Sequence, residues 1–175
     1  LTMTLGVPAP DWLRARDEAV RLLRDRKSLN LVTHHPVHWE ALVEEVRDQL
    51  HAERGASFRW AQIDLEEAAT VEPSGLLRLI IERLGGHANG DHTTFNHLGR
   101  FFEGFDGGCL ALLHFHHITD KEPLFIKGLV RSLRHAQQHN HLTLLFQSKI
   151  VISRFLGDDI VSYLNLHPLE LPPRP

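Results

Sequence analysis

Short apolar segments alternate with longer helical patterns along the 175 residues of this chain. Such alternation indicates βαβ units and a mainly parallel sheet with helices on both faces. The most apolar short segment, residues 110–113, contains no polar residue, which is typical of a central strand covered on both faces. The sequence therefore predicts a three-layer α/β/α sandwich around a mainly parallel sheet of about five strands. The expected strands are residues 29–33, 58–65, 110–113, 142–152 (overrunning into a loop at Ser148) and 164–171.

Helix signals lie before and between these segments. Pro73 and Pro123 stand where proline begins a helix, because the first helical residue needs no N–H partner. Thr93 or Thr94 can cap a further helix by accepting a backbone N–H with its hydroxyl oxygen. The expected helices begin near Asp11, Pro36, Pro73, Thr94, Pro123 and Gly157.

Composition and charge narrow the classes of partner. Hydrophobic residues make up 42% and charged residues 23% of the chain, which is typical of a soluble globular domain. The formal net charge of -3 gives no electrostatic reason to expect a nucleic acid or an anionic membrane. No apolar run reaches the roughly 20 residues of a membrane-spanning helix. We therefore expect no membrane partner, and the net charge disfavours a nucleic-acid partner.

Cys109 is the only cysteine, so the chain has no internal disulfide and suits a reducing compartment, the cytoplasm. A cysteine at the start of an apolar strand usually packs as a small hydrophobe rather than acting as a nucleophile. We expect one domain over residues 1–171, with residues 172–175 starting a proline-rich linker. Leu1 at one end and the prolines at the other indicate a piece of a larger multidomain protein.

The order of these parts resembles the AAA-like and STAND branch of the P-loop NTPases, from about residue 13 to residue 171. The segment "LNLVTHHPVHWEALVEEV" stands where that family has a strand, a phosphate loop and a helix. "FRWAQIDLEEA" matches the second strand with its aspartate, Asp64. "GGCLALLHFHHITD" matches the metal-binding strand, and "LTLLFQSKIVISRF" matches the sensor strand. The resemblance implies a P-loop NTPase-like fold and rests on layout and hydrophobic pattern.

The phosphate-loop positions depart from that family. A phosphate loop needs glycines for close backbone approach, a lysine for the phosphate charge and a hydroxyl for magnesium. Alignment with the family places His38 at the last glycine, Trp39 at the lysine and Glu40 at the hydroxyl. Trp39 carries no charge, and Glu40 would set a negative charge against phosphate oxygens. These degenerate positions predict a chain that binds no nucleotide cofactor.

The metal-binding strand departs from the family as well. The family has an Asp-Glu pair after this strand, one carboxylate for magnesium and one for water. The corresponding positions here are His116 and His117, or His114 and Phe115 if the register is two residues shorter. Neither register supplies two carboxylates. The resemblance thus implies a protein that is not an enzyme, similar to the inactive STAND modules of multidomain bacterial signalling and defence proteins.

The predicted function is a non-catalytic module that binds a protein partner or neighbouring domains of its own chain. We expect Trp39, partly exposed at the mouth of the cleft, to line the binding surface with the histidines. One alternative is a nucleotide-binding domain with an atypical loop. The other is a histidine-rich metal protein: the first and central strands are expected to be neighbours, so His35, His116 and His117 could converge on zinc.

Overall fold

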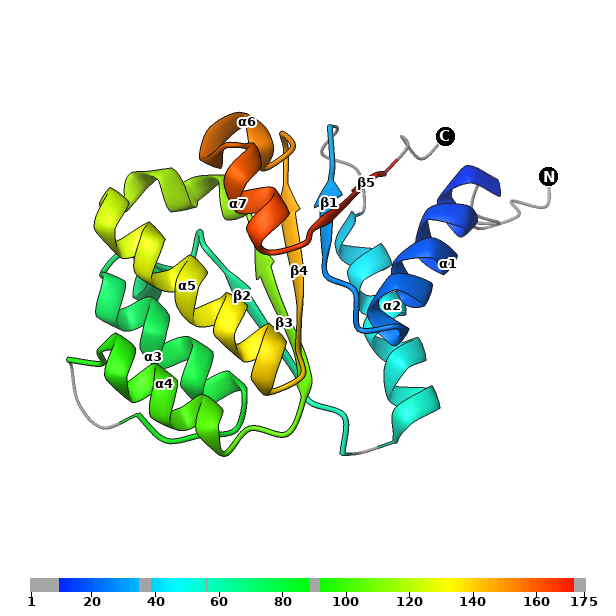
Figure 1. The fold of residues 1–175 in the computed structure, drawn as a ribbon. Helices are drawn as coiled ribbons and strands as arrows, with labels where there is room; N and C mark the ends of the chain where they lie inside the picture. Colours follow the sequence, from blue (N-terminus) through cyan, green and yellow to red (C-terminus); the bar gives the residue numbers. More distant parts are fainter. Residues whose placement is uncertain (1–9, 35–38, 56, 89–91, 172–175) are drawn as a thin grey trace.

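Five parallel strands form a single sheet in the computed structural model, which describes residues 10–34, 39–55, 57–88 and 92–171 (Figure 1). Their spatial order is β2-β3-β4-β1-β5, and every paired register is parallel. The predicted parallel sheet of about five strands is confirmed. The strands are β1 (Leu29–Val32), β2 (Trp60–Asp64), β3 (Gly108–Leu113), β4 (Leu142–Ser148) and β5 (His167–Glu170).

Helices cover both faces of the sheet, which confirms the three-layer architecture (Figure 1). One face packs against α1 (Pro10–Arg24) and α2 (Trp39–Arg54). The other face packs against α3 (Pro73–Arg83), α4 (Phe95–Glu103) and α5 (Pro123–His139). The remaining elements are the 3-10 helices η1 (Ala68–Thr70) and η2 (Phe115–Asp120) and the short helices α6 (Ser153–Leu156) and α7 (Asp158–Tyr163).

The side chains of β3 alternate between the two cores, as the twofold period of a strand requires. Leu110 and Leu112 belong to the core under α3, α4 and α5, whereas Ala111 and Leu113 belong to the core under α1 and α2. All six residues of β3 are buried. This explains why the sequence shows a continuous apolar run here rather than an alternating one.

Local signals set most helix boundaries where the sequence predicts them. Proline begins α3 and α5. Thr94 caps α4 in a capping box, in which its hydroxyl oxygen accepts the His97 N–H and the His97 side chain returns to the Thr94 backbone. The Pro36 start predicted for the second helix lies outside the described residues, and α6 has no counterpart among the predictions.

The prediction that the first and central strands are neighbours is wrong, because β4 lies between β1 and β3. A buried side chain helps to hold β4 beside β1: Asn30 Nδ2 donates to the Phe146 carbonyl at 3.1 Å and to Ser148 Oγ at 3.0 Å. Both β3 and β4 are wholly buried and rich in leucine, so they look alike as candidates for central strands. Hydrophobic pattern alone therefore cannot decide which of them pairs with β1.

Candidate functional site

A chain of hydrogen bonds crosses the carboxyl edge of the sheet, where ligands bind in folds of this class. Asp64 ends β2, and its Oδ1 lies 2.7 Å from His114 Nδ1. The His114 N–H, directly after β3, donates to Gln147 Oε1 at 2.6 Å. Gln147 Nε2 then donates to Thr33 Oγ1, after β1, at 2.9 Å. Four strand ends are thus joined through one buried side chain, Gln147.

His114 occupies the centre of this edge because of its backbone. Its φ of 51° and ψ of 43° place it in the left-handed region, where the chain turns from β3 into η2. The turn brings the imidazole against the edge of the Trp39 ring, with 5.3 Å between ring centroids and 82° between planes. Glu66 Oε1 lies 3.7 Å from His114 Nε2. His114 therefore contacts residues at the end of β2, at the end of β4 and at the start of α2.

The prediction that Trp39 is partly exposed at a cleft mouth is wrong. Only 5% of Trp39 is exposed, and its indole belongs to the core between the sheet and α1 and α2. Burying the apolar ring in the core stabilises the fold more than leaving it partly exposed in a cleft would. Glu40, the next residue, is exposed. His35 and His38, also predicted as site residues, lie outside the described residues.

The prediction that His116 and His117 directly follow the central strand is wrong. β3 ends at Leu113, and the chain turns at His114. The shorter register, with His114 and Phe115, is the one that meets the strand end. His116 and His117 lie in η2 with 4.4 Å between their rings. Burial lowers the pKa of His116, and its Nδ1 is buried without a hydrogen-bond partner among the described residues.

The structure brings together three groups that sequence reasoning did not combine. Ligand atoms of Asp64, Glu66 and His114 all lie within 4.8 Å of one another. His117 joins them, because its Nε2 lies 3.3 Å from Glu66 Oε1. The available signal was Asp64 at the end of β2 and Glu66 just after it, at the same sheet edge as the histidines. This arrangement of imidazole and carboxylate can bind a metal cation or form ion pairs.

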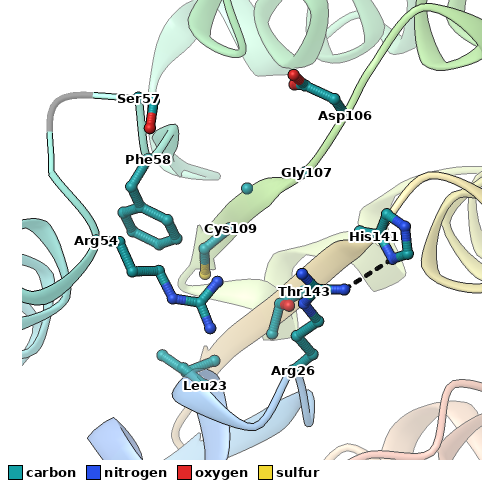
Figure 2. Close-up of a pocket in the computed structure, with 11 residues that line it drawn as sticks. Leu23, Arg26, Arg54, Ser57, Phe58, Asp106, Gly107, Cys109, His141 and Thr143 are labelled. Carbon is teal, nitrogen blue, oxygen red and sulfur yellow. Dashed lines mark hydrogen bonds between the residues drawn. The ribbon is translucent and has the colours of Figure 1, made fainter.

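A hollow of about 260 Å³ lies at the opposite, amino edge of the sheet (Figure 2). Arg26 and Arg54 line it. Arg26 Nη1 lies 3.0 Å from His141 Nδ1, and the Arg54 guanidinium lies beside the Phe58 ring. Neither arginine forms an ion pair within the described ranges of the chain, and Asp106 also lines the hollow, so its wall carries charges of both signs. Cys109 lies at its wall, and burial raises the pKa of its thiol, as suits a packed hydrophobe.

Comparison with known proteins gives a match in structure only. No protein-family model and no curated protein matches the chain. The ORC1 protein of Aeropyrum pernix, solved in complex with DNA, superposes with a TM-score of 0.77 at 13% identity, over 96% of this chain and 46% of that one. The Drosophila ORC bound to DNA superposes with a TM-score of 0.73 at 15% identity, over 93% of this chain and 43% of that one. Saccharomyces cerevisiae RIF2 superposes with a TM-score of 0.53 at 14% identity, over 94% of this chain and 56% of that one.

The chain has a P-loop NTPase-like fold. It spans about half of the length of the chains that it matches, and identities of this size show the fold alone. No helix within the described ranges combines the length and apolar character needed to cross a bilayer.

The prediction that disfavoured nucleic acid as a partner is wrong. Two of the structures that share the fold, ORC1 and the Drosophila ORC, are complexes with DNA. A net charge of -3 says nothing of where the charges lie. On α1, Arg21 forms an ion pair with Glu18, and Arg24 forms one with Glu53. On α5, Lys127 and Arg131 have no ion-pair partner in the described part of the chain.

Proposed function

We propose that this chain is a non-catalytic NTPase-like module that acts by binding other macromolecules. The observation that carries the proposal is the contact between Trp39 and His114. In the alignment with the family, these residues stand at the phosphate-binding lysine and at the metal-binding strand end. An uncharged indole and an imidazole thus pack against each other where an active member needs a cation and a carboxylate.

The chemistry of hydrolysis needs groups that these positions do not offer. Phosphoryl transfer depends on cations that neutralise the developing charge and on a carboxylate or amide that orients the nucleophile. Glu40 would repel phosphate oxygens, and the Trp39 indole is committed to the core. We therefore infer that the cleft binds no nucleoside triphosphate.

Thermal unfolding with and without nucleotide tests this proposal. A ligand present at 100 times its dissociation constant stabilises the folded state by about 2.7 kcal/mol. That corresponds to a rise of several degrees, since 1 kcal/mol shifts the midpoint by about 2–4 °C in a chain of this size. We expect no shift with millimolar ATP, ADP or GTP in the presence of magnesium. A reproducible rise, or release of phosphate above the buffer rate, would contradict the proposal.

Exposed apolar side chains support a protein partner at the carboxyl edge. Val71, Leu124 and Ile150 are 67%, 79% and 49% exposed, and they lie in the segments that follow β2, β3 and β4. Apolar residues grouped at one edge favour protein contact more than the same residues scattered singly. RIF2, which shares the fold, has been solved with the C-terminal domain of Rap1. A role in bacterial signalling and a cytoplasmic location stay predictions from the sequence.

DNA is a second candidate partner, favoured by the unpaired basic residues of α5. Lys127 and Arg131 are four residues apart, so they project from one face of the helix, and both are exposed. Arg134 continues this row one turn later. The DNA complexes of ORC1 and the Drosophila ORC make duplex DNA the natural probe.

Fluorescence anisotropy with a labelled duplex tests this candidate. We expect the double variant Lys127→Glu with Arg131→Glu to bind at least tenfold more weakly than the parent. The slope of log affinity against log salt should fall by about 1.8, because each lost phosphate contact removes about 0.9. The matched control is Arg21→Glu with Arg24→Glu, which makes the same charge change on α1. Equal weakening by both variants would reject α5 as the contact.

A further inference from the structure

We propose that copies of this chain associate head to tail, with the basic outer face of α5 in one copy against the acidic outer face of α2 in the next. The inference deepens the proposed function, because it names a second copy of the chain as a macromolecular partner. The helices α2 and α5 cover opposite faces of the sheet (Figure 1). Both contact faces are therefore accessible in the same molecule.

The outer face of α2 carries a row of carboxylates. Glu40, Glu44 and Asp48 follow one another at intervals of four residues, and all three are exposed. Side chains four residues apart lie on the same face of a helix. Arg47 forms an ion pair with Asp48 at 3.3 Å. Glu40 and Glu44 form no ion pair within the described residues, so their negative charges remain uncompensated.

The outer face of α5 carries the opposite charge. Lys127 and Arg131 are exposed and four residues apart, and the exposed His135 continues their row. The helix α5 itself contains no aspartate or glutamate. Two exposed acids lie on neighbouring segments, Glu103 in α4 and Glu122 before α5. Neither acid forms an ion pair in the described part of the chain, so the charges of Lys127 and Arg131 are available to a partner.

The two helices match in length as well as in charge. The helix α2 has 16 residues and α5 has 17, so each is about 24–26 Å long at a rise of 1.5 Å per residue. Rows with the same four-residue interval can place each cation of one helix opposite a carboxylate of the other. Leu124 is 79% exposed and precedes Lys127 by three residues, so it adds an apolar side chain to the same face of α5.

The contact joins two different faces of the chain, so it is heterologous and can repeat from one copy to the next. Ion pairs between exposed side chains each contribute little to binding, and salt screens them. We therefore expect association between copies to be weak, to increase with protein concentration and to disappear at high salt.

Sedimentation velocity of the full chain without DNA tests the contact. In about 0.01 M salt, where the screening length is about 30 Å, we expect the weight-average mass to rise as the protein concentration approaches about 1 mM. In about 1 M salt, where the screening length is about 3 Å, the chain should sediment as a monomer. Glu40→Lys with Glu44→Lys, and separately Lys127→Glu with Arg131→Glu, should each weaken association at least tenfold. All four residues are exposed, so both variants should fold like the parent, which circular dichroism checks.

A mixture of the two charge-reversed variants is the decisive control. The altered α2 of one variant is basic and the altered α5 of the other is acidic, so the mixture should associate like the parent although neither variant does so alone. Arg21→Glu with Arg24→Glu makes the same charge change on α1 and should leave association unchanged. The proposal is overturned if the parent stays monomeric at low salt, if either variant associates like the parent, or if the mixture stays monomeric. A monomeric parent would leave the nucleotide and DNA tests of the proposed function unaffected.

Discussion

The two edges of the sheet differ in how their polar groups are satisfied. At the carboxyl edge, Asp64, His114, Gln147 and Thr33 bond to one another in an unbroken chain. At the amino edge, the guanidinium of Arg54 donates to the backbone carbonyl of Arg24, and a hollow remains beside it. In an active NTPase-like fold, anion binding belongs at the carboxyl edge. Here that edge carries carboxylates and imidazoles together with Lys149, whereas Arg26 and Arg54 lie at the other end of the strands.

The difference follows from which side chains the strands present at each end. A closed hydrogen-bond chain fixes its members, because removing one leaves the others buried without partners. An open hollow lined by exposed cations loses little when one of them changes. Substitutions at the carboxyl edge should therefore cost stability, while equivalent substitutions at the amino edge should not. Three sets of substitutions compare the edges, in order of falling effect on the free energy of unfolding, and a thiol-labelling measurement follows them.

Trp39→Ala should give the largest effect. The indole is buried at the start of α2, and truncation leaves a cavity beside His114. We expect the free energy of unfolding to fall by about 3–5 kcal/mol, measured by urea denaturation. Trp39→Phe, which keeps an aromatic ring there, should lose less than half as much. A loss below 1 kcal/mol for the alanine variant would mean that Trp39 is not a core residue.

Gln147→Leu should come next, because Gln147 is the one buried bridge between His114 and Thr33. The leucine fills the space but leaves the His114 N–H and the Thr33 hydroxyl without partners. We expect the free energy of unfolding to fall by about 1–3 kcal/mol, measured by urea denaturation. Thr143→Val is the control on the same strand: Thr143 lies at the amino end of β4 beside the hollow, and its hydroxyl makes no hydrogen bond within the described ranges. Equal losses would remove the distinction between the edges.

The sequence predicts the elements of this fold well because their signals are local. Helix starts are set within one turn by Pro73, Pro123 and the hydroxyl of Thr94. A buried strand such as residues 110–113 is recognised from its apolar composition. The strand order depends on side chains such as Asn30, whose partners lie more than a hundred residues away. Such long-range pairing leaves no mark in the local pattern.

The candidate site is less predictable for the same reason. Asp64, Glu66 and His114 can be picked out as polar residues after strands, but the positive φ of His114 decides that its ring, rather than those of His116 and His117, meets Asp64. The amino-edge hollow combines Arg26, Arg54 and His141, which lie at or just after the ends of three different helices and share no motif. Only the folded chain brings them together.

Two histidines with positive φ allow a matched test of backbone and side chain. His114, at the carboxyl edge, has φ 51°, and His141, at the amino edge, has φ 56°. Replacement by glycine relieves the left-handed strain at both positions and adds the same entropy to the unfolded chain. The relief of strain stabilises the folded chain and the added entropy stabilises the unfolded chain, so the two effects nearly cancel. His141→Gly should therefore change the free energy of unfolding by less than about 0.5 kcal/mol. His114→Gly should lose about 1–2 kcal/mol, because the bond to Asp64 and the contact with Trp39 are lost.

Cys109 allows a measurement of another kind, which tests whether the hollow opens onto the sheet. Its sulfur lies at the wall of the hollow, yet only 1% of the residue is exposed, and burial raises the pKa of the thiol. A thiol reagent needs the thiolate, so reaction requires the strand to open. We expect labelling of the native chain to be slower than that of the urea-unfolded chain by a factor of about 10³ or more. Rapid labelling would show instead that the hollow admits reagents to the core, with Cys109→Ser as the blank. Arg26 and Arg54 would then lie at the entrance to a hollow that contains a reactive thiol.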